Sequence, residues 1–519
     1  MKIKSFRATN FRSFLDTGHI TLKPINLLVG KNSIGKSSFA RMWPIFNQGA
    51  KVQKRTPILW NGDLVDFGTF KNILSRHATD KQVIFDFLLE IEKKDLSPKN
   101  NTLRYGNRVH HLRDGEISFN ITLISEETDS SRSRCNKLII SVASVSILYS
   151  FDASGQLIEA QCRDTTIKVT SQYSQENTIG FLAPSTEYFS KQNDVLVPAY
   201  SPMHTRLFYF LRRHLHQRLA NERIHEICTK LNVVGDEIDL LSYCNALPYH
   251  YKTWKDFLYT IKLNETILQN FHTLVLLAAS GSLIKDIDLS LRQHFSTVNY
   301  IRPIRATAQR YYRKQELAVD NIDPEGSNLA FLLVSLTKEK LVHLNKWLSE
   351  TLDVNVILAG EDGEQGHVMV NLLDLTTGRL DNMADMGFGF SQVLPLAVQA
   401  WVSSSPHARI AGRVYHGNTI LVWEQPELHL HPAMQRKLAR LIAKTTKVDA
   451  TRNITFIIET HSQSMINEIG DLIIEEKFDR NSIQLLLFEQ RESFETKITQ
   501  SSYDEDGQLT NWPYGFLSV

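Results

Sequence analysis

The sequence lacks the features that would place the protein in a membrane or outside the cell. No apolar run of roughly 18 residues or more occurs, so we expect no membrane span. The first residues, Met-Lys-Ile-Lys-Ser-Phe, contain no apolar segment of a secretory signal. Cysteine is scarce, and no Cys-x-x-Cys pair occurs among Cys135, Cys162, Cys228 and Cys244, which argues against a zinc site or a disulfide framework. We therefore expect a cytoplasmic protein with reduced thiols.

The sequence also lacks an excess of charge of one sign and any periodic repeat. Its 58 Lys and Arg residues nearly balance its 56 Asp and Glu residues, and the net charge of +2 neither indicates nor excludes a nucleic-acid partner. No internal repeat, low-complexity tract or long heptad pattern occurs, which excludes an extended coiled-coil arm. A chain of 519 residues is too long for one small domain, so we expect several subdomains.

Residues 30–37 read Gly-Lys-Asn-Ser-Ile-Gly-Lys-Ser, which is the G-x-x-x-x-G-K-S phosphate-binding motif. The apolar residues 25–29 before it indicate a buried strand, and the residues after it indicate a helix. In this setting backbone N–H groups and the helix N-terminus attract phosphate oxygens, while Lys36 reaches the β- and γ-phosphates and Ser37 ligates Mg²⁺. The residues predicted to bind the nucleotide are Gly30, Asn32, Ser33, Gly35, Lys36, Ser37 and Ser38.

A second apolar run, residues 420–423, ends in Glu424 and is followed by Gln-Pro-Glu-Leu-His-Leu-His-Pro. This is the Walker B pattern, which we expect to form a buried strand beside the phosphate-loop strand. Its carboxylate, with Ser37, would then hold Mg²⁺, a cation that prefers oxygen ligands. The two histidines of the tail, His429 and His431, are expected to have structural roles in the turn.

A third apolar run, residues 454–458, leads to Glu-Thr-His-Ser at residues 459–462. We expect a buried strand whose polar end carries His461, placed to hydrogen-bond the γ-phosphate or the attacking water. The glycine-rich stretch at residues 385–395 supplies a fourth element, in which Gly389 and Ser391 open a helix and form a second anion-binding N-terminus. It precedes the Walker B run in the chain, which is the order expected if it serves the nucleotide of a second subunit.

The remaining stretches suggest the organisation of the chain. Alternating apolar residues from 83 to 169 predict an antiparallel β lobe, and residues from about 200 to 298 are helical and rich in Arg and His. That basic stretch indicates either a solvated helix face or a surface for nucleic acid or a partner protein. The expected division is an N-terminal ATPase lobe (1–95), a β-hairpin extension (96–198), a helical insertion (199–298), a C-terminal ATPase lobe (299–470) and a small C-terminal domain (471–519).

These motifs, in this order and with a large insertion after the first, resemble the ABC-type ATPase heads of the SMC, RecF and OLD families. The sequence is most similar to bacterial defence-associated AAA-family ATPases of the Septu-like group. Further shared segments are an N-terminal Phe-Arg-Ser-Phe strand at residues 11–14, residues 300–305, and a C-terminal Asp-Gly and Trp-Pro-Tyr-Gly-Phe at residues 506–507 and 512–516. The resemblance does not cover the β hairpins or the helical insertion.

The resemblance implies an α/β fold, namely an ABC-type P-loop ATPase head with an antiparallel β lobe and a helical insertion. It implies ATP and Mg²⁺ as cofactors, with Ser37 and Glu424 at the metal. Such heads pair head-to-tail around ATP, so a homodimer is the minimum assembly, with Gly389 and Ser391 meeting the γ-phosphate in trans. It further implies a separately encoded effector, such as a nuclease or toxin in anti-phage defence, and a possible role for DNA.

One position departs from the ABC pattern. The catalytic glutamate of ABC heads follows the Walker B acid, and here Gln425 stands in that place. An amide orients water but is a poor general base, so either hydrolysis is slow or Glu427 or His461 supplies the base. No Toprim nuclease follows the core, and the acidic residues 504–506 are expected on one turn. The alternative functions are a RecF-like DNA-repair ATPase and a non-hydrolysing, nucleotide-bound scaffold that sequesters an effector.

Overall fold

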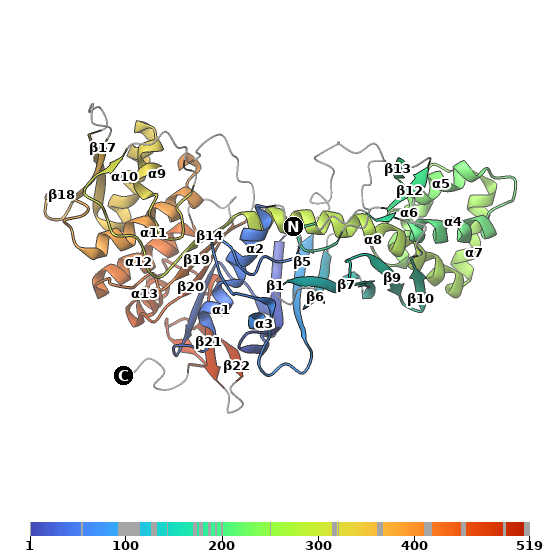
Figure 1. Cartoon of the computed structure of the whole chain (residues 1–519), viewed down its shortest axis with the longest axis horizontal. Coiled ribbons are helices and arrows are strands. Elements are labelled where there is room, and N and C mark those ends of the chain that lie inside the picture. The colour runs from blue at the N-terminus through green and yellow to red at the C-terminus, as the bar shows by residue number, and fades with distance from the viewer. Residues whose placement is uncertain are drawn as a thin grey trace.

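The computed structural model describes residues 2–52, 56–91, 115–125, 132–142, 144–169, 174–175, 180–184, 188–192, 195–198, 201–249, 251–313, 319, 321–360, 367–408, 418–447, 453–490 and 495–512. The chain is elongated, with a helical part at one end and a mixed sheet with its covering helices at the other (Figure 1). An antiparallel sheet lies between them. The predicted α/β class, with an antiparallel lobe and a helical insertion, is confirmed.

A seven-stranded mixed sheet, counted within the described residues, carries the nucleotide motifs. Its spatial order is β14-β19-β20-β4-β21-β22-β23. The first five strands are parallel to their neighbours, and β22 and β23 continue the sheet in antiparallel pairing. The strands are β4 (Ile25–Gly30), β14 (Val298–Ile301), β19 (Thr419–Glu424), β20 (Ile454–Glu459), β21 (Ile483–Gln490), β22 (Thr496–Tyr503) and β23 (Leu509–Thr510).

Both faces of the parallel strands are buried, which explains why their sequences are continuous apolar runs. Successive side chains along a strand point to opposite faces. In β4, Leu28 joins one hydrophobic core, whereas Leu27 and Val29 join the other. In β19, Val422 and Trp423 divide between the same two cores. The sheet therefore separates the molecule into two packed layers.

Different helices cover the two faces of this sheet. Residues of α1 and α2 belong to the same core as Leu28, whereas α9 to α13 contribute to the core on the opposite face. The helices are α1 (Lys36–Ala40), α2 (Met42–Ala50), α9 (Leu329–Ser335), α10 (Lys338–Leu352), α11 (Phe388–Ser404), α12 (Pro432–Thr445) and α13 (Gln463–Ile474). Short helical turns lie at α3 (Phe70–Ile73), η2 (Pro406–Ala408) and η3 (Arg480–Ser482).

An antiparallel sheet forms the lobe predicted between residues 83 and 169. Its order is β10-β9-β8-β7-β6-β5-β1-β2, and β3 pairs with β1. Strands from the expected ranges 1–95 and 96–198 thus share one sheet. The strands are β1 (Lys2–Phe11), β2 (Phe14–Asp16), β3 (Ile20–Thr21), β5 (Gln82–Ile91), β6 (Gly115–Ser125), β7 (Ser133–Val142), β8 (Val145–Phe151), β9 (Leu157–Cys162) and β10 (Thr165–Lys168).

Two small sheets complete the described strands. The first contains β15 (Tyr312–Arg313), β16 (Val354–Ala359), β17 (His367–Asp374) and β18 (Leu380–Asn382). The second contains β11 (Ser174–Gln175), β12 (Tyr188–Gln192) and β13 (Val195–Pro198).

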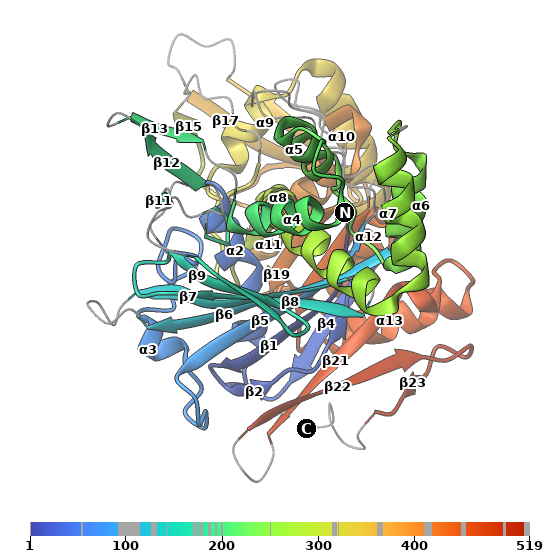
Figure 2. The ribbon, with the colours of Figure 1, turned by 90° about the vertical axis from the view of Figure 1, so that its right-hand side faces the viewer.

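In the described part of the insertion between the β lobe and β14, the chain forms helices α4 to α8. They are α4 (Pro202–His214), α5 (Asn221–Lys230), α6 (Glu237–Ala246), α7 (Lys252–Leu263) and α8 (Glu265–Ser296). They enclose a hydrophobic core of their own. The long helix α8 joins the parts, because Val275 lies in the core of the insertion whereas Ile287 and Leu291 lie in the core shared with the sheets. Figure 2 views this end of the molecule.

Charged side chains of the insertion are partly engaged with one another. Arg223 and Lys230 both bond the carboxylate of Glu226 at 2.9 Å, and Arg212 donates to the carbonyl of Leu219.

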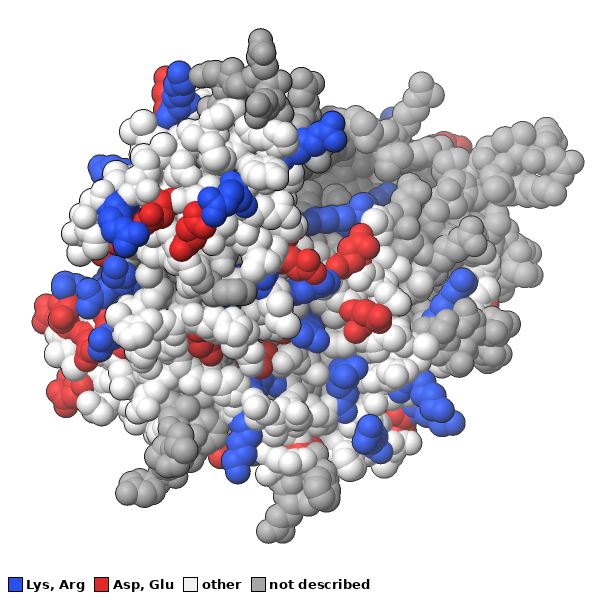
Figure 3. Space-filling view, turned by 60° about the vertical axis from the view of Figure 1, so that its left-hand side comes forward, with Lys and Arg blue, Asp and Glu red and all other residues white. Residues whose placement is uncertain are grey.

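Figure 3 shows the opposite end of the molecule, where Lys and Arg are interspersed with Asp and Glu among the coloured residues. None of the helices in the described ranges combines the length and apolar character that a membrane span needs.

The structure corrects two local predictions. Residues 11–14 do not form a strand, because Phe11 ends β1, Phe14 begins β2 and Arg12 between them has a positive φ of 53°. The Walker B strand does not lie beside the phosphate-loop strand, because β20 pairs with β4 on one side and with β19 on the other. The segment at 512–516 lies, apart from Trp512, outside the described residues.

Candidate nucleotide-binding site

The loop between β4 and α1 has the close backbone approaches that require glycine. A Cβ atom on Gly35 would lie 2.2 Å from the hydroxyl of Ser13, and one on Gly30 would lie 2.6 Å from the carbonyl oxygen of Phe488. Gly35 also caps α1 with a φ of 105°. The hydroxyl of Thr496 donates to the carbonyl of Ile34 at 2.8 Å. The loop therefore packs closely against Ser13 and Phe488 and is hydrogen-bonded to the first residue of β22.

Within the loop, the lysine of the motif is buried together with Gly30 and Ile34. Lys36 is 3% exposed, and its ammonium donates to the carbonyls of Gly30 and Lys31 at 2.9 and 2.6 Å. Burial lowers the pKa of Lys36, whereas the nearby carboxylates of Glu459 and Glu427 oppose that shift. Of the other predicted loop residues, Gly30 is buried, Asn32 and Ser33 are exposed, and Gly35, Ser37 and Ser38 are half-buried.

Two carboxylates reach the same edge of the sheet as this loop. Glu424 ends β19, Glu459 ends β20, and the two are direct partners across the neighbouring parallel strands. Each lies two residues beyond a side chain of the core that contains α1, namely Val422 and Ile457. Because side chains alternate along a strand, both carboxylates face the α1 side. They are 1% and 4% exposed, respectively.

Both oxygens of Glu424 accept hydrogen bonds. The guanidinium of Arg41 donates from Nε and Nη2 to its two oxygens at 2.7 and 2.8 Å, and the Tyr300 hydroxyl donates to Oε1 at 2.7 Å. The hydrogen bond to Glu424 raises the pKa of Arg41, and burial, together with the charge of Glu424, raises the pKa of Tyr300. Sequence reasoning missed both partners, because nothing in their local pattern indicates a contact with the Walker B acid.

Glu459 stands next to the phosphate loop and is less well satisfied. Its Oε1 lies 3.9 Å from the ammonium of Lys36, and its Oε2 is buried without a hydrogen-bond partner in the described part of the chain. Burial raises the pKa of Glu459 and the charge of Glu424 adds to that effect, whereas the Ser37 hydroxyl and Lys36 oppose it. The sequence analysis placed Glu459 at the end of a strand but assigned it no role. Its position immediately before Thr460 and His461 could have indicated that it belongs to the site.

The residues after the two strand ends form a second hydrogen-bonded group. Gln425 has a φ of 44° and donates its backbone N–H to the carbonyl of Glu459 at 2.8 Å. Glu427 Oε1 accepts from the backbone N–H of His461 at 2.7 Å, and its Oε2 is buried without a described partner. Burial raises the pKa of Glu427, and partial burial with the charge of Lys36 lowers the pKa of the His461 ring.

The glycine-rich serine motif begins α11, as predicted. Gly387 caps this helix with a φ of 75°, and Gly389 and Ser391 occupy its first turn. Since α11 packs on the face of the mixed sheet opposite to α1, the structure separates these two residues from the phosphate-loop side. Trp423 Nε1 donates to Gln399 Oε1 at 2.6 Å, which fixes α11 against the Walker B strand.

A buried arginine connects the start of α11 to the Walker B turn. Arg305 is 4% exposed and donates from Nε to Gln392 Oε1 at 3.2 Å and from Nη2 to the carbonyl of Pro426 at 3.3 Å. Burial lowers the pKa of Arg305 to about 10, so the side chain is still charged at neutral pH. The sequence analysis assigned no role to Arg305, although residues 300–305 are among the segments that resemble the defence-associated ATPases.

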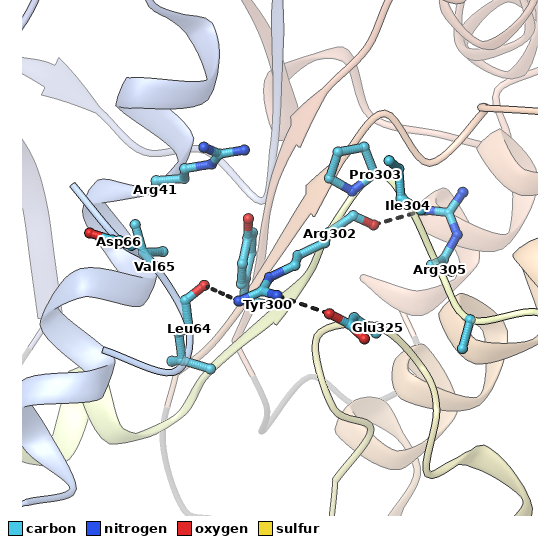
Figure 4. Close-up of a pocket in the computed structure, with 11 residues that line it drawn as sticks. Arg41, Leu64, Val65, Asp66, Tyr300, Arg302, Pro303, Ile304, Arg305 and Glu325 are labelled. Carbon is cyan, nitrogen blue, oxygen red and sulfur yellow. Dashed lines mark hydrogen bonds and ion pairs between the residues drawn. The ribbon is translucent and has the colours of Figure 1, made fainter. Parts of the chain in front are cut away.

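A cavity of about 590 Å³ opens beside these residues. Figure 4 shows Arg41 and Tyr300 on one side of it and Arg302, Pro303 and Arg305 on the other. Arg302 bridges the two sides, because it donates to the carbonyl of Leu64 at 3.0 Å and to the carboxylate of Glu325 at 3.0 Å. The cavity therefore continues from the Arg41–Glu424 contact.

The donor atoms near the loop fit a metal–nucleotide complex. The Ser37 hydroxyl and the carboxylates of Glu424 and Glu459 are hard oxygen ligands of the kind that Mg²⁺ takes. His429 and His431 belong to the turn before α12, where His431 Nδ1 accepts from the backbone N–H of Ala433. No group of metal-ligating side chains that includes them was found among the described residues.

Comparison with known proteins identifies the family. Two similar solved structures are the Smc head bound to the C-winged helix domain of ScpA (12% identity, TM-score 0.37, covering 97% of this chain and 99% of that chain) and the Smc head domain with an extended coiled coil bound to the C-terminal domain of ScpA, from Pyrococcus furiosus (11%, 0.37, 96% and 96%). No curated protein matches the chain. The family model described as AAA ATPase domain matches residues 1–466. This chain, with its phosphate loop and paired carboxylates, therefore belongs to the AAA ATPase domain family.

Proposed function

We propose that the chain is a Mg²⁺-dependent, slowly hydrolysing ATPase of the ABC type that closes around ATP as a homodimer and controls a partner effector. The observation that carries this proposal is the convergence of Lys36, Ser37, Glu424 and Glu459 at one edge of the parallel sheet. A lysine and a helix N-terminus bind phosphates, and the carboxylates and hydroxyl suit a hard cation. When bound, Mg²⁺ would neutralise charge on the phosphates.

Nucleotide binding and turnover test the core of the proposal. Wild-type protein is expected to bind ATP in the presence of Mg²⁺ and to release phosphate slowly. Lys36→Ala is expected to lose ATP binding, because it removes the ammonium that now donates to the carbonyls of Gly30 and Lys31 and would pair with the β- and γ-phosphates. Ser502→Ala, which changes a hydroxyl at the end of β22 away from the phosphate loop, is the matched control. ATP binding that survives in Lys36→Ala would contradict the proposed site.

The dimer is supported by the placement of α11. Its first turn carries an anion-binding helix N-terminus on the face of the sheet away from α1, so Gly389 and Ser391 are placed to meet the nucleotide of a second copy. ATP would then stabilise the closed dimer only to the extent that it binds this state better than the open one. Mass measurement with and without ATP tests this step.

The effector is proposed from the resemblance to defence-associated ATPases and from the surface of the insertion. Large apolar side chains are exposed on α4, α6 and α7, at 62% for Tyr209, 68% for Ile238 and 67% for Tyr259. Exposed apolar side chains of this size are common at protein–protein contacts. The insertion lies at the far end of the molecule from the mixed sheet and its helices (Figure 1).

Co-purification with the products of neighbouring genes tests the effector and the anti-phage role together. A nuclease or toxin that co-purifies, and is lost when Tyr209 and Ile238 are replaced by serine, would support both. Phosphate release that rises with DNA would favour the RecF-like alternative. The amide at Gln425 favours the scaffold alternative. A complex that holds the effector and binds ATP without ever hydrolysing it would establish this alternative.

A further inference from the structure

The charged side chains of the insertion are divided unequally between its helices. Residues 201–220, which include α4, contain four arginines and no acidic residue, and residues 251–264, which include α7, contain three lysines and the acidic Asp256. Residues 221–246, which include α5 and α6, contain five acidic and two basic residues. The small net charge of the whole chain therefore conceals a basic part of the insertion, made by α4 and α7.

Each of these two helices places a tyrosine between two cations on one face. Side chains that are three, four or seven positions apart lie on the same side of an α-helix. We call the six residues with this spacing the basic face, namely Arg206, Tyr209 and Arg213 on α4 and Lys255, Tyr259 and Lys262 on α7.

The side chains of the basic face point to solvent. Tyr209 and Tyr259 are 62% and 67% exposed, and the four cations are exposed as well. None of these four cations forms an ion pair with a carboxylate in the described ranges. By contrast, Arg223 and Lys230 on α5 share the carboxylate of Glu226. The charge of the basic face is therefore available to a partner.

The two halves of the basic face lie on helices that contact each other. Phe257 of α7 packs against Phe210 and His214 of α4, with ring centroids 6.4 and 5.8 Å apart. Just after α4, the backbone N–H of His216 donates to the Thr253 hydroxyl of α7 at 2.7 Å. Figure 2 shows both helices at the end of the molecule that faces the viewer. One extended partner can therefore reach both helices.

The chemistry of the basic face fits a nucleic acid better than a protein. Lysine is depleted at protein–protein interfaces, whereas lysine and arginine are the usual partners of the phosphate backbone. An exposed tyrosine adds a flat ring on which an unpaired base can stack. Because the bases of a duplex are already stacked on one another, the two tyrosines favour a single strand.

We propose that the basic face binds single-stranded nucleic acid without sequence preference, with its four cations along the phosphates and its two tyrosines stacked on bases. This inference goes beyond the proposed function, because it assigns a ligand to the end of the molecule far from the nucleotide site (Figure 1) and does not require ATP. The effector would then contact the acidic side of the insertion, where Ile238 lies between Glu237 and Asp239.

Fluorescence anisotropy of a labelled oligothymidylate tests the proposal on the full chain, without ATP and over a range of salt concentrations. Wild type is expected to bind, with an affinity that falls as salt rises. Replacing Lys255 and Lys262 together by glutamine is expected to weaken binding. It should also reduce the slope of log affinity against log salt by about 1.4, since each phosphate contact of a single strand contributes about 0.7. Replacing Arg223 and Lys230 by glutamine is the matched control, because it removes two cations from α5, and it should leave the slope unchanged.

Tyr259→Ser tests the stacking separately from the charge. It is expected to weaken binding about tenfold at a fixed salt concentration and to leave the salt slope unchanged, because a stacked base is lost but no cation is. Ile238→Ser removes an apolar side chain of similar exposure, 68%, from α6 and is the matched control. These side chains are exposed, so the thermal midpoint of each variant should stay close to that of wild type.

The outcomes separate this inference from its alternatives. Binding of oligothymidylate, of oligouridylate or of both supports it and names the polymer, whereas wild type that binds neither overturns it. An unchanged salt slope in the lysine variant also overturns it. Equal affinity for a duplex, with no effect of Tyr259→Ser, overturns the assignment to a single strand. A co-purified protein that the lysine variant releases, with no oligonucleotide bound by wild type, assigns the face to an acidic protein instead.

The proposed function fails or stands on a different measurement. Wild type that binds an oligonucleotide but no ATP contradicts the proposed function and leaves the basic face standing. Wild type that binds ATP but no oligonucleotide overturns this inference alone.

Discussion

Arg41 and Glu424, which are 383 positions apart in the chain, form a bidentate ion pair through Nε and Nη2 at 2.7 and 2.8 Å. Arg41 follows the short helix α1 that begins in the phosphate loop, and Glu424 ends the Walker B strand. The pair therefore joins the two nucleotide motifs across the layers of the protein. Tyr300 at the end of β14 adds a third strand to the same contact.

We expect Arg41→Ala to lower the stability of the fold by about 2 kcal/mol, because it leaves the Glu424 carboxylate buried with Tyr300 as its remaining partner. The measurement is the shift in thermal midpoint, compared with Glu424→Gln and with the double variant. Coupling between the two sites should make the double variant less destabilised than the sum of the singles. If the effects of the two single substitutions simply add, the interaction between Arg41 and Glu424 contributes no stability.

Gln425→Glu is expected to speed ATP hydrolysis by about tenfold or more, since a carboxylate accepts a proton from water and an amide does not. Gln425 follows Glu424 directly, and its backbone N–H bonds the carbonyl of Glu459, so the side chain lies at the strand ends. Phosphate release under saturating ATP measures the effect. Glu427→Gln in the wild-type background is the control for the alternative base. A wild-type rate equal to that of Gln425→Glu would show that slow hydrolysis is not set by this residue.

Gly389→Glu is expected to prevent ATP-dependent dimerisation while the monomer still binds ATP. Among the described residues, a Cβ at this position would meet only Leu430, at 4.0 Å, so the fold should tolerate the change. A carboxylate added to the helix N-terminus would repel the triphosphate of a second copy. Light scattering with and without ATP reports the assembly, and Lys36→Ala serves as the comparison that loses ATP itself. Dimers that form normally in Gly389→Glu would exclude this face from the interface.

Arg305→Met should destabilise the fold by about 1–3 kcal/mol, because the buried carbonyl of Pro426 and the amide of Gln392 lose a charged donor. Thermal unfolding measures the change. Arg310→Met is the matched control from the same segment, since Arg310 is 63% exposed and its ion pair with Asp385 should contribute only about 0–1 kcal/mol. Equal effects of the two substitutions would contradict the buried role of Arg305.

The stability of the chain should fall as the pH drops from about 6.5 to about 4, partly through His294. Burial lowers the pKa of His294 to about 4, so the folded protein keeps this ring neutral while the unfolded chain takes up a proton below about pH 6.5. Between pH 7 and pH 5 this single group should remove about 2 kcal/mol of stability. His294→Phe should flatten that part of the profile, and an unchanged difference between the two thermal midpoints would contradict the assignment.

Local features of the site could be predicted from the sequence because they depend on residues close together in the chain. The phosphate loop, its glycines, the strand before it and the helix after it all follow from backbone geometry within residues 25–50. The same is true of the start of α11 at Gly387 and of the alternating strands of the β lobe. The family then followed from the order of these motifs.

Only the tertiary structure decided which residues meet. An apolar run shows that a strand is buried but not which strand lies beside it, so β20 rather than β19 became the neighbour of β4. The ion pair of Arg41 with Glu424 and the contact of Arg305 with Pro426 depend on that order, because they join segments that are 383 and 121 residues apart. For the same reason, it was the arrangement of the strands that set Glu459 beside Lys36.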